Sequence, residues 1–301
     1  MELLKFDEDM MEDVAGLYAE AVKKVPYCYP VALEDFAAAV AGAVGGDPKG
    51  KGLQEEGILV GANKGKPKGY AHFGVGKHRK EQTEPSGYVR FFWYCPTHRA
   101  VGEALLQEME SFFREKGLGE SVAFWQCHRY PFYHRENSFL SEQMAHVPAF
   151  LGRNGYEIQG GEVFYDWPEM RVPQPERPNL DFEETVIWQE GAGELPNSEV
   201  RAVQEGKVVG VCETASCQES GDGPGVGDWC FVLHLNVTEK LQGRGLGRYL
   251  LSRSLQEMKG AGYKHAGIST SMKNYRAAIF YSSFGEARLG DWTYGWVKQL
   301  D

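Results

Sequence analysis

The stretch "LQGRGLGRYLL", Leu241–Leu251, decides how the C-terminal part of the chain is interpreted. Its three glycines and two arginines follow an apolar run of strand character and open a helical one. Unpaired N–H groups and partial positive charge at a helix N-terminus stabilise an anion, and glycines let the backbone approach a bulky phosphate. Arg244 and Arg248 would add charge-assisted hydrogen bonds. The stretch therefore predicts a phosphate-binding loop, with a tight turn and solvated arginines as the alternative.

Two common phosphate motifs do not fit this loop. It reads G-x-G-x-G, whereas a dinucleotide fold uses G-x-G-x-x-G and a P-loop uses G-x-x-x-x-G-K-[ST]. The residues that follow the loop must therefore decide which phosphorylated ligand it would hold.

Composition limits the classes of partner. The 301 residues suggest about two domains. A net charge of −10 disfavours nucleic acid, because phosphates would be repelled. Six cysteines without a CxxC pair indicate reduced thiols. The acidic N-terminus is unlike a signal peptide, and no window has the apolar length of a membrane span. We therefore expect a cytoplasmic protein without a membrane partner.

Two similar series of elements run along the chain. Each has three strands and a helix, and each helix is expected to end at a glycine, Gly117 or Gly260. Strands alternating with helices in this way indicate α/β architecture, so we interpret the chain as two diverged copies of one fold. The predicted strands and helix are 57–62, 70–75, 88–95 and 103–117 in the first copy, and 200–204, 208–213, 229–237 and 247–260 in the second.

Prolines mark the boundary between the copies. Four of the chain's fourteen prolines lie between Pro168 and Pro178, which predicts a linker. The predicted domains are 1–167 and 180–301, joined by the linker 168–179.

The two copies differ in two further respects. Only the first has helical segments before its strands, 7–25 and 32–44.

The first copy also carries an insert, "CHRYPFYHRENSFLSEQM", residues 127–144. Its cysteine and histidines lack the spacing of a zinc site, so no metal is expected. We interpret the insert as a surface excursion, with a cover over an acceptor pocket as the alternative.

A second motif follows the glycine loop in the C-terminal copy. The segment "SMKNYRAAIFYSSFGE" contains Asn274, Ala277, Tyr281 and Gly285 at helical spacing. With the loop, it resembles the GNAT superfamily of acyl-CoA-dependent N-acyltransferases, whose patterns are [QR]-x-x-G-x-[GA] and N-x-x-A-x-x-x-Y-x-x-x-G. The chain departs from the family at two positions, where Glu239 replaces a proline and Glu286 an aromatic residue.

The resemblance implies a fold class, α/β (α+β). Each of the two GNAT-like domains would have a mixed, mostly antiparallel central sheet flanked by helices. The N-terminal copy matches less well, because Glu103 places a carboxylate where the loop would hold a diphosphate. Met144 and Leu151 stand where the other copy has Asn274 and Tyr281. We interpret the first copy as a degenerate, non-catalytic repeat.

The resemblance also implies acetyl-CoA as the cofactor of the C-terminal copy. The loop would hold its diphosphate, strand backbone near Leu235 and Val237 would pair with the pantetheine arm, and Asn274 would orient the cofactor or a water. Tyr281 stands at the family's general-acid position, with a packing role for its ring as the alternative. The predicted loop residues are Gln242, Gly243, Arg244, Gly245, Leu246, Gly247 and Arg248.

No residue stands out as the general base. Regular strand alternation would place His234 with Cys230 and Val232 on one face, and Phe231 and Leu235 on the other. His234 is then a core histidine and only a weak candidate for the base. Glu213 and Asp228 have no better support, and a chain of waters remains an alternative.

The resulting functional prediction is an N-acetyltransferase. It would move an acetyl group from acetyl-CoA to a primary amine by direct attack, with a small molecule or a peptide as acceptor. Because the second copy lacks the early helices, the first copy is hypothesised to support the acceptor pocket. The alternatives are a non-catalytic acyl-CoA sensor or scaffold and an unrelated nucleotide-binding protein. The sequence identifies neither the acceptor nor the oligomeric state.

Overall fold

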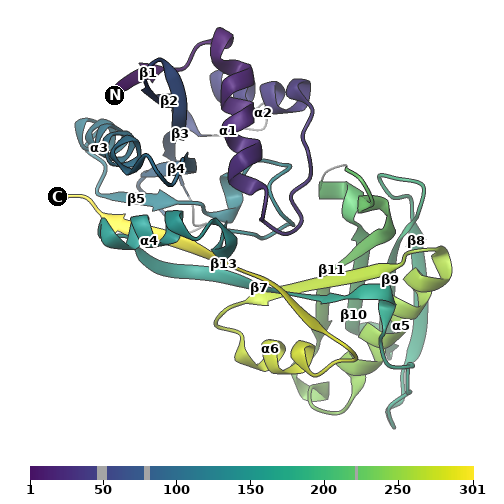
Figure 1. The fold of residues 1–301 in the computed structure, drawn as a ribbon. Helices are drawn as coiled ribbons and strands as arrows, with labels where there is room; N and C mark the ends of the chain where they lie inside the picture. Colours follow the sequence, from purple (N-terminus) through teal and green to yellow (C-terminus); the bar gives the residue numbers. More distant parts are fainter. Residues whose placement is uncertain (46–52, 78–81, 221–222) are drawn as a thin grey trace. The chain divides into compact units, whose positions relative to one another are not determined.

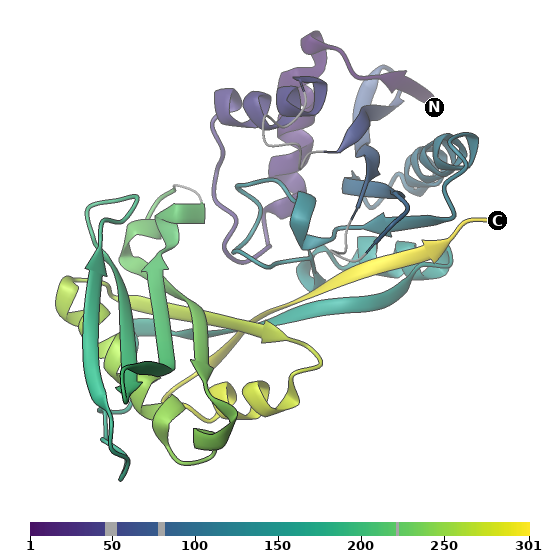
Figure 2. The same ribbon diagram turned by 180° about the vertical axis from the view of Figure 1, so that it is seen from behind.

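The computed structural model describes residues 1–45, 53–77, 82–220 and 223–301. The chain folds into two compact units, one of residues 1–162 with 291–301 and one of residues 163–290. Each unit has a mixed sheet flanked by helices (Figures 1 and 2), which confirms the predicted fold class. None of the described helices has the length and apolar character to span a membrane.

The sheet of the first unit follows the order β1-β2-β3-β4-β5-β13-β7. Neighbouring strands up to β4 run antiparallel, whereas β4 and β5 are parallel. The predicted strands 57–62, 70–75 and 88–95 are confirmed as β2, β3 and β4. The strands are β1 (Glu2–Lys5), β2 (Gln54–Asn63), β3 (Lys66–Gly76), β4 (Ser86–Tyr94), β5 (Glu120–Ala123), β6 (Leu140–Ser141), β7 (Glu157–Trp167) and β13 (Arg288–Gln299).

Helices cover both faces of this sheet. The two predicted N-terminal helices are confirmed as α1 (Met11–Val22) and α2 (Leu33–Gly45), which lie on one face. On the other face lies α3 (Arg99–Glu115), which buries Leu105, Met109 and Phe113 at helical spacing (Figure 1). A shorter helix, α4 (His146–Arg153), precedes β7. Gly117, just after α3, has φ +70°, as expected of a helix-ending glycine.

The insert 127–144 is part of the core of the first unit, so its interpretation as a surface excursion is wrong. Tyr130 is 1% exposed and Tyr133 is 2% exposed. The Tyr130 ring packs against Tyr18 of α1 and Phe36 of α2 at centroid distances of 5.8 and 5.9 Å. Phe132 contacts the same two rings, so Tyr130 and Phe132 of the insert pack against α1 and α2.

The sheet of the second unit follows the order β7-β12-β11-β10-β9-β8. Its strands pair antiparallel from β8 to β11, and β11 and β12 are parallel. All three predicted strands are confirmed as β9, β10 and β11. β8 pairs antiparallel with β9 as β1 does with β2, and no helix lies between β8 and β9. The strands are β8 (Glu183–Gln189), β9 (Asn197–Gln204), β10 (Lys207–Ser216), β11 (Trp229–Val237) and β12 (His265–Ser271).

One long helix packs on this sheet. Helix α5 (Leu246–Ala261) buries Leu250, Leu251 and Leu255, and the Thr214 and Ser254 hydroxyls meet at 2.7 Å between β10 and α5. The helix continues through Gly260. It ends at Gly262, whose φ is +116° and whose N–H donates to the carbonyl of Lys259. The predicted end at Gly260 is therefore wrong, because the left-handed conformation falls two residues later. A short helix, α6 (Tyr275–Ser282), follows β12.

The compact units divide the chain differently from the predicted domains. The division falls within β7, at residues 162 and 163, and the last eleven residues return to the first unit. There β13 pairs with β5, with Val297 opposite Val122. The proline-rich segment belongs to the second unit, where the Arg171 carbonyl accepts a hydrogen bond from the Glu286 N–H.

A β-bulge breaks the alternation of β11. His234 lies opposite Glu213 but Val232 lies opposite Thr214, so Leu233 is an extra residue. Thr214 faces α5, and Val232 therefore does too, whereas His234 lies on the opposite face. His234 is exposed there, so its prediction as a core histidine is wrong. Leu235, opposite Cys212, returns to the α5 face.

Candidate functional site

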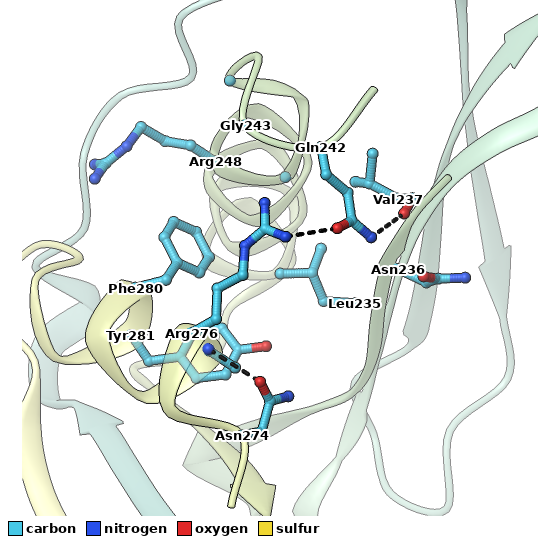
Figure 3. A pocket seen from close by; sticks show the side chains of 13 residues that line it. Leu235, Asn236, Val237, Gln242, Gly243, Arg248, Asn274, Arg276, Phe280 and Tyr281 are labelled. Atoms are coloured by element: carbon cyan, nitrogen blue, oxygen red, sulfur yellow. Dashed lines mark hydrogen bonds between the residues drawn. The ribbon is translucent and has the colours of Figure 1, made fainter. Parts of the chain in front are cut away.

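A cavity of about 590 Å³ opens in the second unit between β11, the N-terminus of α5 and α6 (Figure 3). It brings together most of the predicted cofactor residues from segments nearly forty residues apart. Its lining comprises Leu235, Asn236, Val237, Gln242, Gly243, Gly245, Gly247, Arg248, Asn274, Arg276, Ala277, Phe280 and Tyr281.

One wall of the cavity is the C-terminal part of β11, where this strand is no longer paired with β12. The ladder between β11 and β12 runs from Trp229 opposite His265 to Val232 opposite Ile268. The bulge at Leu233 follows at once, and residues 234–237 lie beyond that ladder. Backbone polar groups in such a position need other partners. This stretch of β11 therefore offers peptide groups to an extended ligand arm lying along it.

The glycine loop forms the second wall. Gly243 and Gly245 have φ of +74° and +90°, a region that L-residues enter only with strain. Gly245 is the N-cap of α5 and provides no side-chain cap. The first N–H groups of α5 are therefore available at the cavity, next to the positive end of the helix dipole. The geometry suits an anionic group.

Gln242 connects the glycine loop to β11 and to α6. Its Nε2 donates to the Val237 carbonyl at 2.8 Å, and its Oε1 accepts from Arg276 Nη1 at 2.8 Å (Figure 3). Both ends of the amide are therefore used, which fixes its orientation.

The third wall is α6. Asn274 caps this helix, since its Oδ1 accepts from the Ala277 N–H at 3.2 Å. Tyr281 is 7% exposed, and its ring lies 5.3 Å from that of Phe280 and 6.2 Å from that of Tyr165. Figure 3 shows its hydroxyl directed into the space between α6 and β11. Asn274 thus has a structural role that the sequence motif alone does not express.

Three predicted residues lie outside the lining: Arg244, Leu246 and His234. Leu246 is buried, whereas Arg244 and His234 are exposed. Arg248 does line the cavity, but its guanidinium lies over the rings of Phe280 and Phe284, at 5.8 and 5.5 Å from their centroids.

The lining also includes residues that the sequence analysis did not select: Asn236, Arg276, Ala277 and Phe280. Ala277 belongs to the second motif and Arg276 stands two residues after Asn274. Ala277 lies three residues after Asn274 and four before Tyr281, a helical spacing that could have identified it from the sequence, whereas Arg276 carries no such signal.

The first unit has the same strand irregularity. In β4 the extra residue is Arg90, because Phe91 lies opposite His72 and Val89 lies opposite Phe73. Aligning Arg90 with Leu233 makes Phe92 the counterpart of Leu235, and Tyr94 the counterpart of Val237. The two units can therefore be compared position by position.

Aromatic side chains fill the corresponding place in the first unit. Phe92 is fully buried and stacks on Phe150 of α4 at a centroid distance of 5.6 Å. The Tyr94 ring packs on Gly102, where a Cβ would approach it to 2.5 Å. Leu151, aligned with Tyr281, is also fully buried.

The counterpart of the glycine loop differs as well. Gly102, aligned with Gly245, lies inside α3, and Glu103 pairs with Arg99 at 2.7 Å in the first turns of that helix. A regular helical turn therefore replaces the left-handed glycines of the second unit.

Comparison with known proteins identifies a family for the second unit. Residues 163–285 match the sequence model of the acetyltransferase (GNAT) family. No curated protein sequence matches the chain.

Solved structures match nearly the whole chain. A tandem GNAT protein from the clavulanic acid biosynthesis pathway is 14% identical, with 100% of this chain and 98% of that chain covered and a TM-score of 0.63. A GCN5-related N-acetyltransferase from Sphaerobacter thermophilus is 13% identical, with 99% and 95% covered and a TM-score of 0.59. Residues 163–285 are therefore a GNAT domain, and the chain as a whole has a tandem GNAT fold.

Proposed function

We propose that this protein is an N-acetyltransferase that moves the acetyl group of acetyl-CoA to a primary amine in its second unit. The observation that carries the proposal is the cavity that joins a glycine loop, a diverging strand and Tyr281. These three parts match the three chemical parts of the donor substrate: a diphosphate, an extended amide-bearing arm and a thioester.

The chain offers a suitable partner for each part of acetyl-CoA. The N–H groups at the start of α5 would hold the diphosphate, because they are unpaired within the helix and carry partial positive charge. Backbone at Leu235–Val237 would pair with the pantetheine amides in the manner of an added strand. A backbone N–H of the same stretch would stabilise the negative charge that develops on the carbonyl oxygen.

The reaction requires one bond to form and one to break. The lone pair of a neutral amine attacks the acetyl carbon and forms the C–N bond, and the C–S bond breaks with its electron pair moving to sulfur. The Tyr281 hydroxyl would donate its proton to that sulfur, and the amine nitrogen gives up a proton to a base. His234 is exposed on the face of β11 opposite α5 and outside the cavity lining, so as the base it would act through water.

The first unit would not bind a second donor molecule. The positions that correspond to Leu235 and Tyr281 are Phe92 and Leu151, and both are fully buried in its core. We therefore propose one acetyl-CoA site per chain.

Calorimetric titration with acetyl-CoA tests the binding step. We expect one site per chain and no comparable affinity for ATP or NADH. A preference for either nucleotide would favour the unrelated nucleotide-binding protein.

Release of coenzyme A thiol across a panel of amines, peptides included, tests the transfer step. Thiol release that depends on an amine and falls in Tyr281→Phe would support the proposed reaction. Binding without thiol release from any amine would instead indicate a sensor or scaffold.

A further inference from the structure

Arg276 lies in the cavity with its charge directed at the glycine loop. It is the second residue of α6 and is exposed. Its side chain crosses from α6 towards Gln242 (Figure 3). A Cβ built on Gly243 would lie 4.0 Å from Arg276 Nη2, so the guanidinium lies beside Gly243 of the loop.

The partner of Arg276 is neutral. Its Nη1 donates to an amide oxygen, Gln242 Oε1, and no carboxylate within the described part of the chain forms an ion pair with it. A guanidinium has five N–H donors and keeps its charge at all relevant pH values. Arg276 therefore brings an uncompensated charge and unused donors to a cavity already positive at the α5 N-terminus.

The other arginines near the loop are directed elsewhere. Arg248 lies over Phe280 and Phe284, and Arg244 is exposed outside the cavity lining. Arg276 is thus better placed to contact an anion than the two arginines of the loop sequence.

In the first unit, the residue that corresponds to Arg276 contacts the neighbouring strand directly. With Leu151 aligned to Tyr281, His146 is the counterpart of Arg276. Its Nε2 lies 2.8 Å from the carbonyl oxygen of Tyr94, the counterpart of Val237. In the second unit Gln242 donates to the Val237 carbonyl instead, which leaves the α6 cation to bind something else.

We propose that Arg276 binds the diphosphate of acetyl-CoA by exchanging the Gln242 amide oxygen for phosphate oxygens. A charge-assisted, bidentate contact to phosphate is stronger than one hydrogen bond to a neutral amide, so the exchange is favourable. Gln242 keeps its bond to Val237 and continues to hold the loop against β11. The proposal rests on the proposed function, since it names a binding residue of the same site.

The test compares a ligand that carries the diphosphate with one that lacks it. Acetyl-CoA is titrated by calorimetry, and S-acetylpantetheine, which lacks the diphosphate and the nucleotide, is titrated by ligand-detected NMR at millimolar concentration. In Arg276→Gln the affinity for acetyl-CoA should fall about tenfold or more, the worth of a hydrogen bond to a charged group. Affinity for S-acetylpantetheine should change by less than about twofold, because the lost contact involves phosphate only.

Two further variants separate charge from position. Arg276→Lys should recover part of the acetyl-CoA affinity, because a point charge still binds phosphate. Arg244→Gln removes the same charge from the loop outside the cavity lining and should weaken acetyl-CoA less than Arg276→Gln does.

Equal weakening of both ligands in Arg276→Gln would overturn the proposal, because Arg276 would then act only by holding Gln242 and the loop. An unchanged affinity for acetyl-CoA would overturn it as well. Failure of the proposed donor site is distinguishable, since the unsubstituted protein would then bind neither ligand, and failure of acetyl transfer is detected separately by the thiol-release assay.

Discussion

Replacing Gly245 and Gly247 separately by alanine should change stability in opposite directions. The Gly245 φ of +90° lies in the left-handed region, where an L-residue costs roughly 1–2 kcal/mol. The added Cβ would lie 3.4 Å from Pro178 Cβ, an ordinary contact, so strain would come from the backbone alone. Lower entropy of the unfolded chain offsets about 0.4–1 kcal/mol. Gly245→Ala should therefore destabilise α5 by about 1 kcal/mol.

Gly247→Ala is the matched control. Gly247 lies in the first turn of α5, and an added Cβ would meet Val237 Cγ2 at 3.7 Å, again an ordinary contact. Alanine is favoured over glycine inside a helix by about 1 kcal/mol. This variant should stabilise α5, which makes the expected difference between the two variants about 2 kcal/mol.

Hydrogen exchange of the α5 amides measures this difference, because it reports local as well as global opening. Calorimetry with acetyl-CoA measures the consequence for binding. If the strained turn is needed to present the N–H groups of α5, Gly245→Ala should weaken acetyl-CoA by about five- to thirtyfold, the equivalent of 1–2 kcal/mol. A loss of stability of the same size in both variants would refute the reasoning, since backbone conformation distinguishes the two positions.

Three other variants test the remaining parts of the chain. Tyr281→Phe keeps the ring contacts with Tyr165 and Phe280 and should leave acetyl-CoA affinity nearly unchanged, while steady-state turnover falls about 10²-fold if its proton is used; unchanged turnover would exclude the role. Phe150→Ala removes the ring stacked on Phe92 and should destabilise the first unit by about 3–5 kcal/mol in denaturant titrations, with acetyl-CoA stoichiometry still one; a second site would contradict the filled core. Burial raises the pKa of Glu162 to about 8, so the unfolded chain loses this proton first and the native protein loses stability as pH rises from about 4.5 to 8. The free energy of unfolding, measured across this pH range, should be larger for Glu162→Gln than for the unsubstituted protein by about 2–4 kcal/mol at pH 8 and equal to it near pH 4.5. A difference between the two proteins that does not change with pH would show that Glu162 titrates normally.

The sequence alone predicted the parts of the protein that depend on local physics. The glycine loop, helix α5 and the repeated strands follow from turn chemistry and apolar periodicity, which act over a few residues. The sequence also predicted that the second unit lacks the two early helices, because residues 180–199, which include β8, contain no helical pattern. Most of the predicted cofactor residues do line one cavity, since two ordered motifs constrain the fold around them.

Only the tertiary structure decided the features that depend on distant partners. The bulge at Leu233 places His234 on the open face of the sheet, and no local signal marks the extra residue because register is set by the neighbouring strand. The last strand returns to the first unit, where it pairs with β5 and β6, which lie more than 150 residues earlier in the chain. Arg276 is an unremarkable surface residue in the sequence. It becomes a candidate for phosphate binding only because folding brings α6 beside the Gln242 amide, and contacts between segments so far apart have no counterpart in local sequence.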